Sequence, residues 1–407
     1  MATKQEILDL LEEEDIEFIR LQFTDPLGIL RNTAVTRRSL KKVLNDDRYA
    51  FNAKKVFNSD EEELFLKPDL STFSILPWRP QNRKVARFIC DVVYEDGTEY
   101  SLSPRTILKK TVRSAEEKGY KFFFNTDCEF FLFHNDENGV PTTDTSEAAG
   151  YMDVAPLDLG ENARRDMILM LEDMGFNIIA SHHETSPAQH EIDFEEEESM
   201  NIADAMITFK NSIRSIAMRF GLYATFMPKP RNDFAGSGMH VKLHVFKDDK
   251  PVFNDLAEGK LDSEGGAFAA GIMKYAPEMC FITNPIVNSY KRNFSDRLKL
   301  HTRKNADAKL ELLFPDATSN PYLDVALFIA AGMKGVEEKL TADKNMVTAP
   351  LPRNLYDALI AAEKGNLAKE VLGDDFVFKY LKARNIEWND YMSYVGEWEI
   401  KNYLYRI

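Results

Sequence analysis

The segment spanning residues 121–133 constrains the fold more than any other, because it has the pattern of a long apolar β-strand that carries two acids. Phenylalanines fill both of its ends, and Asp127 and Glu129 lie near its centre on either side of Cys128. Side chains alternate between the faces of a strand, so both carboxylates point to the same side. Burying them is costly unless a cation neutralises them. From spacing alone, the simpler interpretation is that the acids face solvent and only the phenylalanines face the core; the other interpretation is a cation site.

The composition is that of a globular protein with an acidic surface. The 407 residues suffice for a sizeable core and for two domains rather than one. Hydrophobic residues make up 44% and charged residues 29%, which excludes a mainly disordered chain. The net charge of −15, with no compensating basic run, argues against direct binding of nucleic acid or of an anionic membrane. The acidic runs 60–63 and 195–198 are typical of solvated loops.

The cysteines and the chain start bear on the cellular compartment. Cys90, Cys128 and Cys280 are far apart and offer neither a disulfide framework nor a zinc-binding spacing, which is typical of a reducing compartment. The first fifteen residues have the pattern of a charged amphipathic helix and not of a signal peptide. The longest apolar stretch, near residues 325–333, is too short to span a bilayer. We therefore expect a cytoplasmic protein with no membrane partner.

Two α+β domains are expected, over residues 1–100 and 101–407. In the first, the patterns predict a helix over 4–14 and strands over 17–23 and 85–94. Ser103 and Pro104 then open a helix that runs to Gly119. The second domain combines strands and helices irregularly and is mostly helical from residue 320 onward. Its expected strands are 121–133, 177–181, 189–194, 223–227, 239–246 and 309–314, and its best-marked helices are 157–174 and 202–220.

A second group of acids and histidines follows in the middle of the chain. Glu184 and Glu191 flank a turn that contains proline, where acids are usually surface residues. His182, His183 and His190 lie beside them and are more often structural histidines than ligands. Taken alone, these residues are weak evidence for a site.

Two further signals lie later in the sequence. His240 follows the segment Gly236-Ser237-Gly238-Met239, which predicts a tight loop before a strand but is a weak sign of phosphate binding. Glu311 is an acid within the apolar strand segment 309–313. Each signal is again weak on its own.

The sequence strings around these residues are more specific than the residues themselves. They occur in the order and spacing of type I glutamine synthetase, and they cover nearly the whole chain. They are IRLQFTDPLG, VARFICDV, EFFLF, YMDVAPLDLGENARRD, ASHHETSPAQHEIDF, ATFMPKP, GSGMH, NPIVNSYKR and NPYL. The chain therefore resembles the glutamine synthetase family, and most closely its short bacterial type without the adenylylation region.

This resemblance implies a fold, an assembly and a set of cofactors. The expected fold is α+β, with a small N-terminal β-grasp domain and a larger catalytic domain built on a curved antiparallel sheet. The expected assembly is a homo-oligomer, a dodecamer of two rings with active sites between neighbouring subunits. The cofactors implied are Mg²⁺ or Mn²⁺ together with ATP or ADP.

The resemblance also assigns two metal positions. The first is formed by Glu129, Glu184 and Glu191, and the second by Asp127, His240 and Glu311. The family has glutamate where this chain has Asp127, so one ligand is shorter by a methylene. Carboxylate oxygens with one imidazole suit Mg²⁺ or Mn²⁺.

The family's general base is not matched. It is the aspartate of an F-D-G-S-S motif, and the corresponding stretch here is Ala50-Phe51-Asn52-Ala53-Lys54. An amide such as that of Asn52 cannot accept a proton from ammonium near neutral pH. The asparagine of the family's N-G-S-G-M-H motif is also replaced, by Ala235.

The arginines that hold the amino acid in the family are mostly missing too. Arg292 matches one of them, and Gly236 is the other position that the resemblance assigns to substrate binding. Residues 293–308 are too few to hold both the flap and the further arginines of the family. In the next strand the R-x-E-x-R motif becomes Lys309-Leu310-Glu311-Leu312-Leu313, so that Leu313 replaces the second arginine.

Three functions are compatible with this pattern. We favour a glutamine synthetase-like pseudoenzyme of nitrogen metabolism, which acts by binding an authentic glutamine synthetase or a nitrogen regulator in a mixed complex. The alternative is an ATP-dependent carboxylate–amine ligase with a different substrate, bulkier or less charged, which Leu313 and the shortened flap would suit. The retained metal ligands favour this alternative, because clustered carboxylates without a metal repel one another. A third reading is a poor glutamine synthetase that uses free ammonia and so tolerates Asn52.

Overall fold

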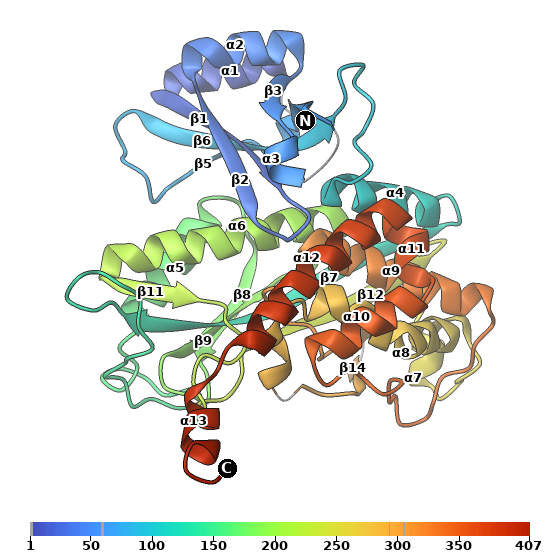
Figure 1. Ribbon diagram of the computed structural model, residues 1–407. Coiled ribbons are helices and arrows are strands. Elements are labelled where there is room, and N and C mark those ends of the chain that lie inside the picture. Colours follow the sequence, from blue (N-terminus) through green and yellow to red (C-terminus); the bar gives the residue numbers. More distant parts are fainter. Residues whose placement is uncertain (1–2, 58–60, 293, 304–305) are drawn as a thin grey trace.

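The computed structural model describes residues 3–57, 61–292, 294–303 and 306–407. It contains two β-sheets, each with its own helices (Figure 1). The first sheet and helices α1 and α2 lie at one end of the molecule, and the C-terminal helix α13 lies at the other (Figure 1). None of the helices in these ranges is both long and apolar enough to cross a membrane.

The N-terminal sheet has six strands in the order β2-β1-β6-β4-β3, with β5 also paired to β6. β1 and β6 run parallel, whereas the other pairs are antiparallel. Helix α1 begins with a capping box on Thr3 and buries Ile7 and Leu11 against the sheet. The elements are α1 (Lys4–Glu13), β1 (Ile16–Thr24), β2 (Leu30–Thr36), α2 (Arg37–Asp46), β3 (Tyr49–Asn52), α3 (Lys54–Phe57), β4 (Glu63–Pro68), β5 (Ser74–Ile75) and β6 (Lys84–Val93).

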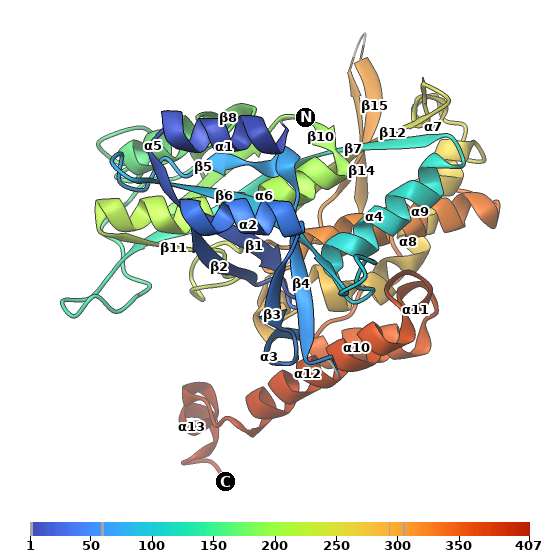
Figure 2. The ribbon, with the colours of Figure 1, turned by 90° about the horizontal axis from the view of Figure 1, so that it is seen from above.

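The second sheet has nine strands, all paired antiparallel, in the order β14-β15-β12-β7-β9-β8. β10 and β11 also pair with β7, and β13 pairs with β12. Its strands are β7 (Tyr120–His134), β8 (Ile178–His183), β9 (Gln189–Phe194), β10 (Glu197–Glu198), β11 (Leu222–Thr225), β12 (Met239–Lys247), β13 (Lys250–Pro251), β14 (Leu298–Arg303) and β15 (Ala306–Leu312). β14 and β15 form a hairpin at the edge of this sheet, where β15 extends beyond the neighbouring strands (Figure 2).

Helices cover the apolar face of the second sheet. Phe124, Cys128 and Phe130 point to this face and are fully buried, and the Phe130 ring packs against Phe209 of α6. The C-terminal third is helical, as expected. The helices are α4 (Pro104–Glu116), α5 (Glu161–Glu172), α6 (Ser199–Ala217), α7 (Asn254–Ala257), α8 (Glu264–Thr283), α9 (Pro321–Glu337), α10 (Leu355–Lys364), α11 (Leu367–Leu372), α12 (Asp374–Ser393) and α13 (Glu397–Tyr403).

Two sequence-based expectations need correction. The helix predicted over 157–174 begins only at Glu161, because the N–H groups of Leu159 and Gly160 donate to loop carboxylates instead of starting the helix. The strand predicted over 309–314 is β15, which begins earlier, at Ala306, within the segment 293–308; that segment also contains β14, for which no prediction was made. Residues 293, 304 and 305 of that segment, residue 60 of the acidic run 60–63, and residues 1–2 of the N-terminal segment lie outside the described residues.

Candidate functional site

Strand β7 positions the first two acids of the candidate site. Cys128 between them is buried in the core, so Asp127 and Glu129 both lie on the opposite face of the sheet. Asp127 is paired with Asp193 of β9 and with His240 of β12, and Glu129 is paired with Glu191 of β9. Acids of β7 and β9 and the imidazole of His240 therefore meet on one face, of which the strand pattern predicted only the shared side of Asp127 and Glu129.

The first predicted metal set comprises Glu129, Glu184 and Glu191. Glu184 directly follows β8, and its N–H donates to the carbonyl of Gln189 at 2.7 Å, which folds the turn back toward β9. His182 Nε2 lies 2.9 Å from Glu184 Oε1 and 3.7 Å from Glu191 Oε1. Possible ligand atoms of His182, Glu184 and Glu191 lie within 4.8 Å of one another, and Glu129 is not part of this group.

Glu129 is held beside this group by hydrogen bonds to one of its oxygens. Gln189 Nε2 donates to Glu129 Oε2 at 2.8 Å, and the N–H of Gly238 donates to the same atom at 3.0 Å. Burial nevertheless raises the pKa of Glu129 to about 7, and the charge of Glu184 acts in the same direction. Burial and the neighbouring carboxylates, Glu129 first among them, also raise the pKa of Glu191.

These electrostatics fit a bound cation at the first set. In the described ranges, no lysine or arginine forms an ion pair with Glu129, Glu184 or Glu191, although the charge of Arg292 acts on Glu129. Several carboxylates gathered without a matching cation repel one another. A divalent metal would relieve this repulsion, and oxygen ligands are those that Mg²⁺ and Mn²⁺ prefer.

The second predicted set comes together with all three of its residues, and its surroundings are different. Possible ligand atoms of Asp127, His240 and Glu311 lie within 4.8 Å of one another. The Lys242 ammonium forms an ion pair with Asp127 Oδ2. Glu311 Oε2 lies 2.9 Å from His301 Nε2 and 3.5 Å from Lys299 Nζ.

Neighbouring basic groups therefore balance the negative charge of Glu311. Burial would raise the pKa of this carboxyl, but the hydrogen bond from His301 and the charges of His240 and Lys299 outweigh it and lower the pKa. Lys242, Lys299 and His301 were not singled out in the sequence. The alternation of apolar and basic residues in Leu298-Lys299-Leu300-His301 is a strand signal that could have identified two of them.

Arg292 is buried beside the first set, and one nitrogen of its guanidinium is bonded to the backbone, whereas its buried Nε has no hydrogen-bond partner among the described residues. Its guanidinium Nη2 donates to the carbonyls of Phe314 at 2.6 Å and of Pro315 at 2.9 Å. A Cβ on Gly236 would lie 2.4 Å from the Arg292 side chain, so the glycine makes room for the arginine. Gly236 and Arg292, the two predicted substrate positions, are thus neighbours.

The other positions that depart from the family pattern have local structural roles. Leu313 follows β15 and is buried. Asn52 ends β3 in the N-terminal sheet, and its Oδ1 accepts a hydrogen bond from the N–H of Lys55 at 3.2 Å, at the start of α3. Within one chain, Asn52 therefore lies on a different sheet from the acids of the candidate site.

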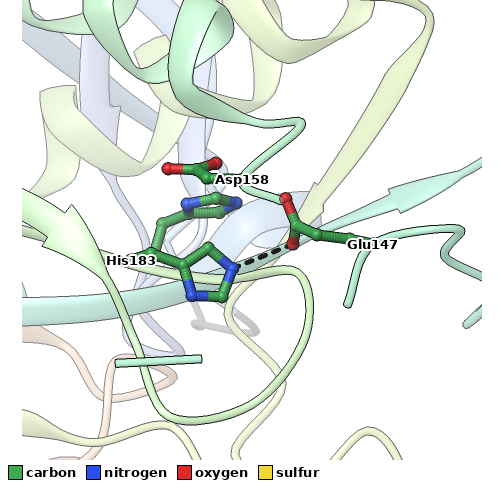
Figure 3. Close-up of side chains that lie close together, drawn as sticks. Glu147, Asp158 and His183 are labelled. Atoms are coloured by element: carbon green, nitrogen blue, oxygen red, sulfur yellow. Dashed lines mark hydrogen bonds and ion pairs between the residues drawn. The ribbon is translucent and has the colours of Figure 1, made fainter. Parts of the chain in front are cut away.

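A separate buried network supports the loop that carries Glu184. Glu147 belongs to the long loop after β7, and its carboxylate faces His183 at the end of β8 (Figure 3). His183 Nε2 lies 2.9 Å from Glu147 Oε2, and the N–H groups of Leu159 and Ala188 also donate to this carboxylate. Burial alone would raise the pKa of Glu147, but these hydrogen bonds and the charges of the two histidines lower it to about 2.

Asp158 and His190 complete this network around an arginine. Arg164 Nη2 lies 2.8 Å from Asp158 Oδ2, and Arg164 Nη1 lies 2.7 Å from His190 Nδ1. Burial and the Arg164 charge lower the pKa of His190 to about 3. A guanidinium already neutralises the group, so we interpret it as structural. His183 and His190 are thus structural histidines, whereas His182 contacts the candidate metal ligands.

Comparisons with known proteins agree with this geometry. Residues 15–95 match the family model described as glutamine synthetase, beta-Grasp domain, and residues 101–403 match that of glutamine synthetase, catalytic domain. A glutamine synthetase of Clostridium saccharobutylicum is 42% identical over 99% of this chain and 98% of its own length. A glutamine synthetase of Thermus thermophilus is 38% identical over 99% of both chains.

Solved structures lead to the same family. The structure of GmaS without ligand superposes with a TM-score of 0.86 and 27% identity, over 98% of this chain and 99% of the other. A cryo-EM structure of Plasmodium falciparum glutamine synthetase has a TM-score of 0.87 at 21% identity, over 99% of both chains, which shows the same fold. The expected α+β fold, a β-grasp domain followed by a catalytic domain with a curved antiparallel sheet, is confirmed. The chain belongs to the glutamine synthetase family.

Proposed function

We propose that this chain is a metal-binding member of the glutamine synthetase family that has lost ordinary glutamine synthesis and acts by binding. The observation that carries this proposal is the direct connection from the Arg292 segment to Glu311 through the short β14–β15 hairpin. That hairpin stands where the family holds its flap and further arginines. Of the arginines that hold the amino acid in the family, only Arg292 is matched, and its Nη2 donates to backbone carbonyls.

Two further positions support the loss of activity. Leu313 replaces an arginine with a buried apolar side chain, which cannot bind a carboxylate. Asn52 replaces the general base, and the loss of one such base typically lowers a rate by about 10²–10⁴. Poorer positioning of the amino acid would lower the rate further.

The proposed metal is Mg²⁺ or Mn²⁺, held by Glu129, Glu184 and Glu191. When bound, such an ion neutralises negative charge on nucleotide phosphates. The protein itself orients the ligands: Gln189 and Gly238 hold Glu129, and Glu147, bonded to His183 and to the Ala188 N–H, holds the turn that follows Glu184. ATP or ADP is the proposed second ligand, in line with a GmaS structure in complex with ADP that is 27% identical to this chain.

A second candidate is an ATP-dependent ligase that joins a different carboxylate and amine. Leu313 favours it, because an apolar side chain in place of an arginine suits a less charged substrate.

The two candidates differ in whether they catalyse turnover. A screen of carboxylic acids and amines with Mg²⁺ and ATP, read as phosphate release, should stay at background for the first. Robust release with any pair would favour the second.

We further propose that the chain assembles into a homo-oligomer or enters a mixed complex. Helix α13 and the residues after it expose large apolar side chains, including Trp398, Leu404 and Tyr405, which another subunit would cover. An authentic glutamine synthetase or a nitrogen regulator is the proposed partner in a mixed complex.

The test combines binding with assembly. Calorimetry should show Mn²⁺ binding to the purified chain, and Mg²⁺ with ADP should raise its melting temperature. Native mass measurement after a pull-down from cell extract should give a homo-oligomer or a mixed complex. A chain that binds neither metal nor nucleotide and remains a monomer without partners would contradict the proposal.

A further inference from the structure

A row of alternating charges crosses the second sheet at Glu311. Lys242 of β12 is the Cα partner of Glu311 on one side, and Lys299 of β14 is its partner on the other. Residues directly opposite one another on neighbouring strands point to the same face. The backbone register therefore sets an acid between two lysines.

Lys242 also reaches the other acid of the second predicted set. His240 lies two residues before Lys242 on β12 and is the Cα partner of Asp127 on β7. Lys242 is therefore the diagonal neighbour of Asp127 across the two strands. The Lys242 ammonium forms an ion pair with Asp127, and the two side chains are only 24% and 12% exposed. The contact is thus partly shielded from water.

The hairpin brings the remaining positive groups. Lys299 and His301 are two residues apart on β14 and face Glu311, whose side chain is 4% exposed. The strand that carries them stands where the family has its flap and arginine segment. Two carboxylates, Asp127 and Glu311, are therefore matched by two ammonium groups, Lys242 and Lys299.

The first set is different. In the described parts of the chain, Glu129, Glu184 and Glu191 contact His182 and hydrogen-bond donors, but no lysine lies in an ion pair with any of them. A divalent ion entering there meets excess negative charge. One entering the second position must first displace ammonium groups that already neutralise its ligands.

From this difference we propose that the Asp127–His240–Glu311 position is filled by the protein's own lysines and does not hold a metal, so that each subunit binds one divalent ion where the family pattern implies two. The family's metal does not fit this position, although its ligand atoms are retained. This inference rests on the proposed function for the remaining site at Glu129, Glu184 and Glu191, but it concerns a different set of residues.

The experiment counts Mn²⁺ per subunit by equilibrium dialysis of the full chain, after its metals have been removed with a chelator. We expect one site in the unaltered protein. The double variant Lys242→Gln and Lys299→Gln removes both ammonium groups and should bind a second Mn²⁺ at least about 100-fold more tightly than the unaltered protein does. Circular dichroism confirms that the variant is folded.

A matched control removes the same charge elsewhere. Lys118 and Lys274 form exposed ion pairs with Glu337 and Glu338 on the helical side of the domain. The double variant Lys118→Gln and Lys274→Gln should keep one site.

The outcomes separate this inference from the proposed function. Two comparably tight sites in the unaltered protein, or no added site in a folded Lys242→Gln/Lys299→Gln variant, would overturn the inference. If the unaltered protein binds no Mn²⁺ at all, the metal site of the proposed function fails. The inference is then still decided by whether the lysine variant gains a site that the unaltered protein lacks.

Discussion

The Lys242 ammonium forms an ion pair with the Asp127 carboxylate across the adjacent strands β12 and β7. Two residues further along β7 lies Glu129, which makes no such pair and whose pKa is raised to about 7, chiefly by burial. Two acids on the same face of one strand therefore differ in whether a basic side chain pairs with them. One is neutralised by the protein, and for the other we propose an external cation.

Removing Lys242 should destabilise the metal-free protein. The variant Lys242→Met leaves Asp127 partly buried without its partner, so we expect the free energy of unfolding to fall by about 1–3 kcal/mol in urea titrations with EDTA. Lys121 offers a control, because its ion pair with Asp249 joins side chains that are 60% and 83% exposed. Lys121→Met should change the free energy of unfolding much less, because exposed ion pairs contribute little to stability. Equal losses in the two variants would show that the Lys242 pair contributes nothing special.

Neutralising an acid of the first set should have the opposite effect. Glu191→Gln removes one of several mutually repelling carboxylates, so in EDTA the free energy of unfolding should rise, by about 1 kcal/mol. The stabilisation that Mn²⁺ adds should shrink. Glu196→Gln is the comparison, because Glu196 is paired with Lys309 at 2.5 Å and contacts His244, so that its loss should destabilise. A Glu191→Gln protein that is less stable in EDTA and unchanged in its response to Mn²⁺ would contradict the assignment.

The Glu147–His183 pair should support metal binding from outside the site. Glu147→Gln places an amide N–H₂ among several donors, so we expect a loss of about 3 kcal/mol of stability and weaker Mn²⁺ binding at the adjacent Glu184. Urea titrations and calorimetry measure the two effects. Unchanged metal affinity would restrict the pair to a purely structural role.

The pH dependence of this variant has a defined sign. The pKa of Glu147 is lowered from the usual 4.5 to about 2, so its stabilisation is present above pH 4.5 and is lost as the pH falls toward 2. For His183, burial alone would lower the pKa, but Glu147 raises it above 6.5, and this stabilisation is present below pH 6.5 and is lost as the pH rises through the raised value. The stability difference between the unaltered protein and Glu147→Gln should therefore be largest between about pH 4.5 and 6.5.

Restoring the general base alone should not restore synthesis. Aspartate caps a helix as well as asparagine does, so Asn52→Asp should keep the contact to the Lys55 N–H and change stability by about 0.5 kcal/mol at most. Glutamine formation should remain undetected, because the amino-acid clamp is still missing. A gain of 100-fold or more in this variant would show that the base was the main defect.

The sequence predicted the face-sharing acids and the strands that carry them, because alternation along 121–133 is a local pattern. β9 was predicted with its observed bounds, Gln189–Phe194. The set of acids and histidines that meet on that face could be named only through the family resemblance, since their meeting depends on strand order. The pairing of Lys242 with Asp127 depends on the register of β12 against β7, and that of Lys299 with Glu311 depends on a hairpin that replaces a longer family segment. Neither register can be read from a local pattern.

The central claim, a retained metal site without glutamine synthesis, is tested most directly by glutamine formation in the metal-loaded protein. The assay supplies glutamate, ammonium, ATP and saturating Mg²⁺ or Mn²⁺, with an active glutamine synthetase as the reference, and measures glutamine by mass spectrometry. We predict turnover at least about 10⁴-fold below the reference, from the combined loss of base and clamp. Turnover within about tenfold of the reference would contradict the account.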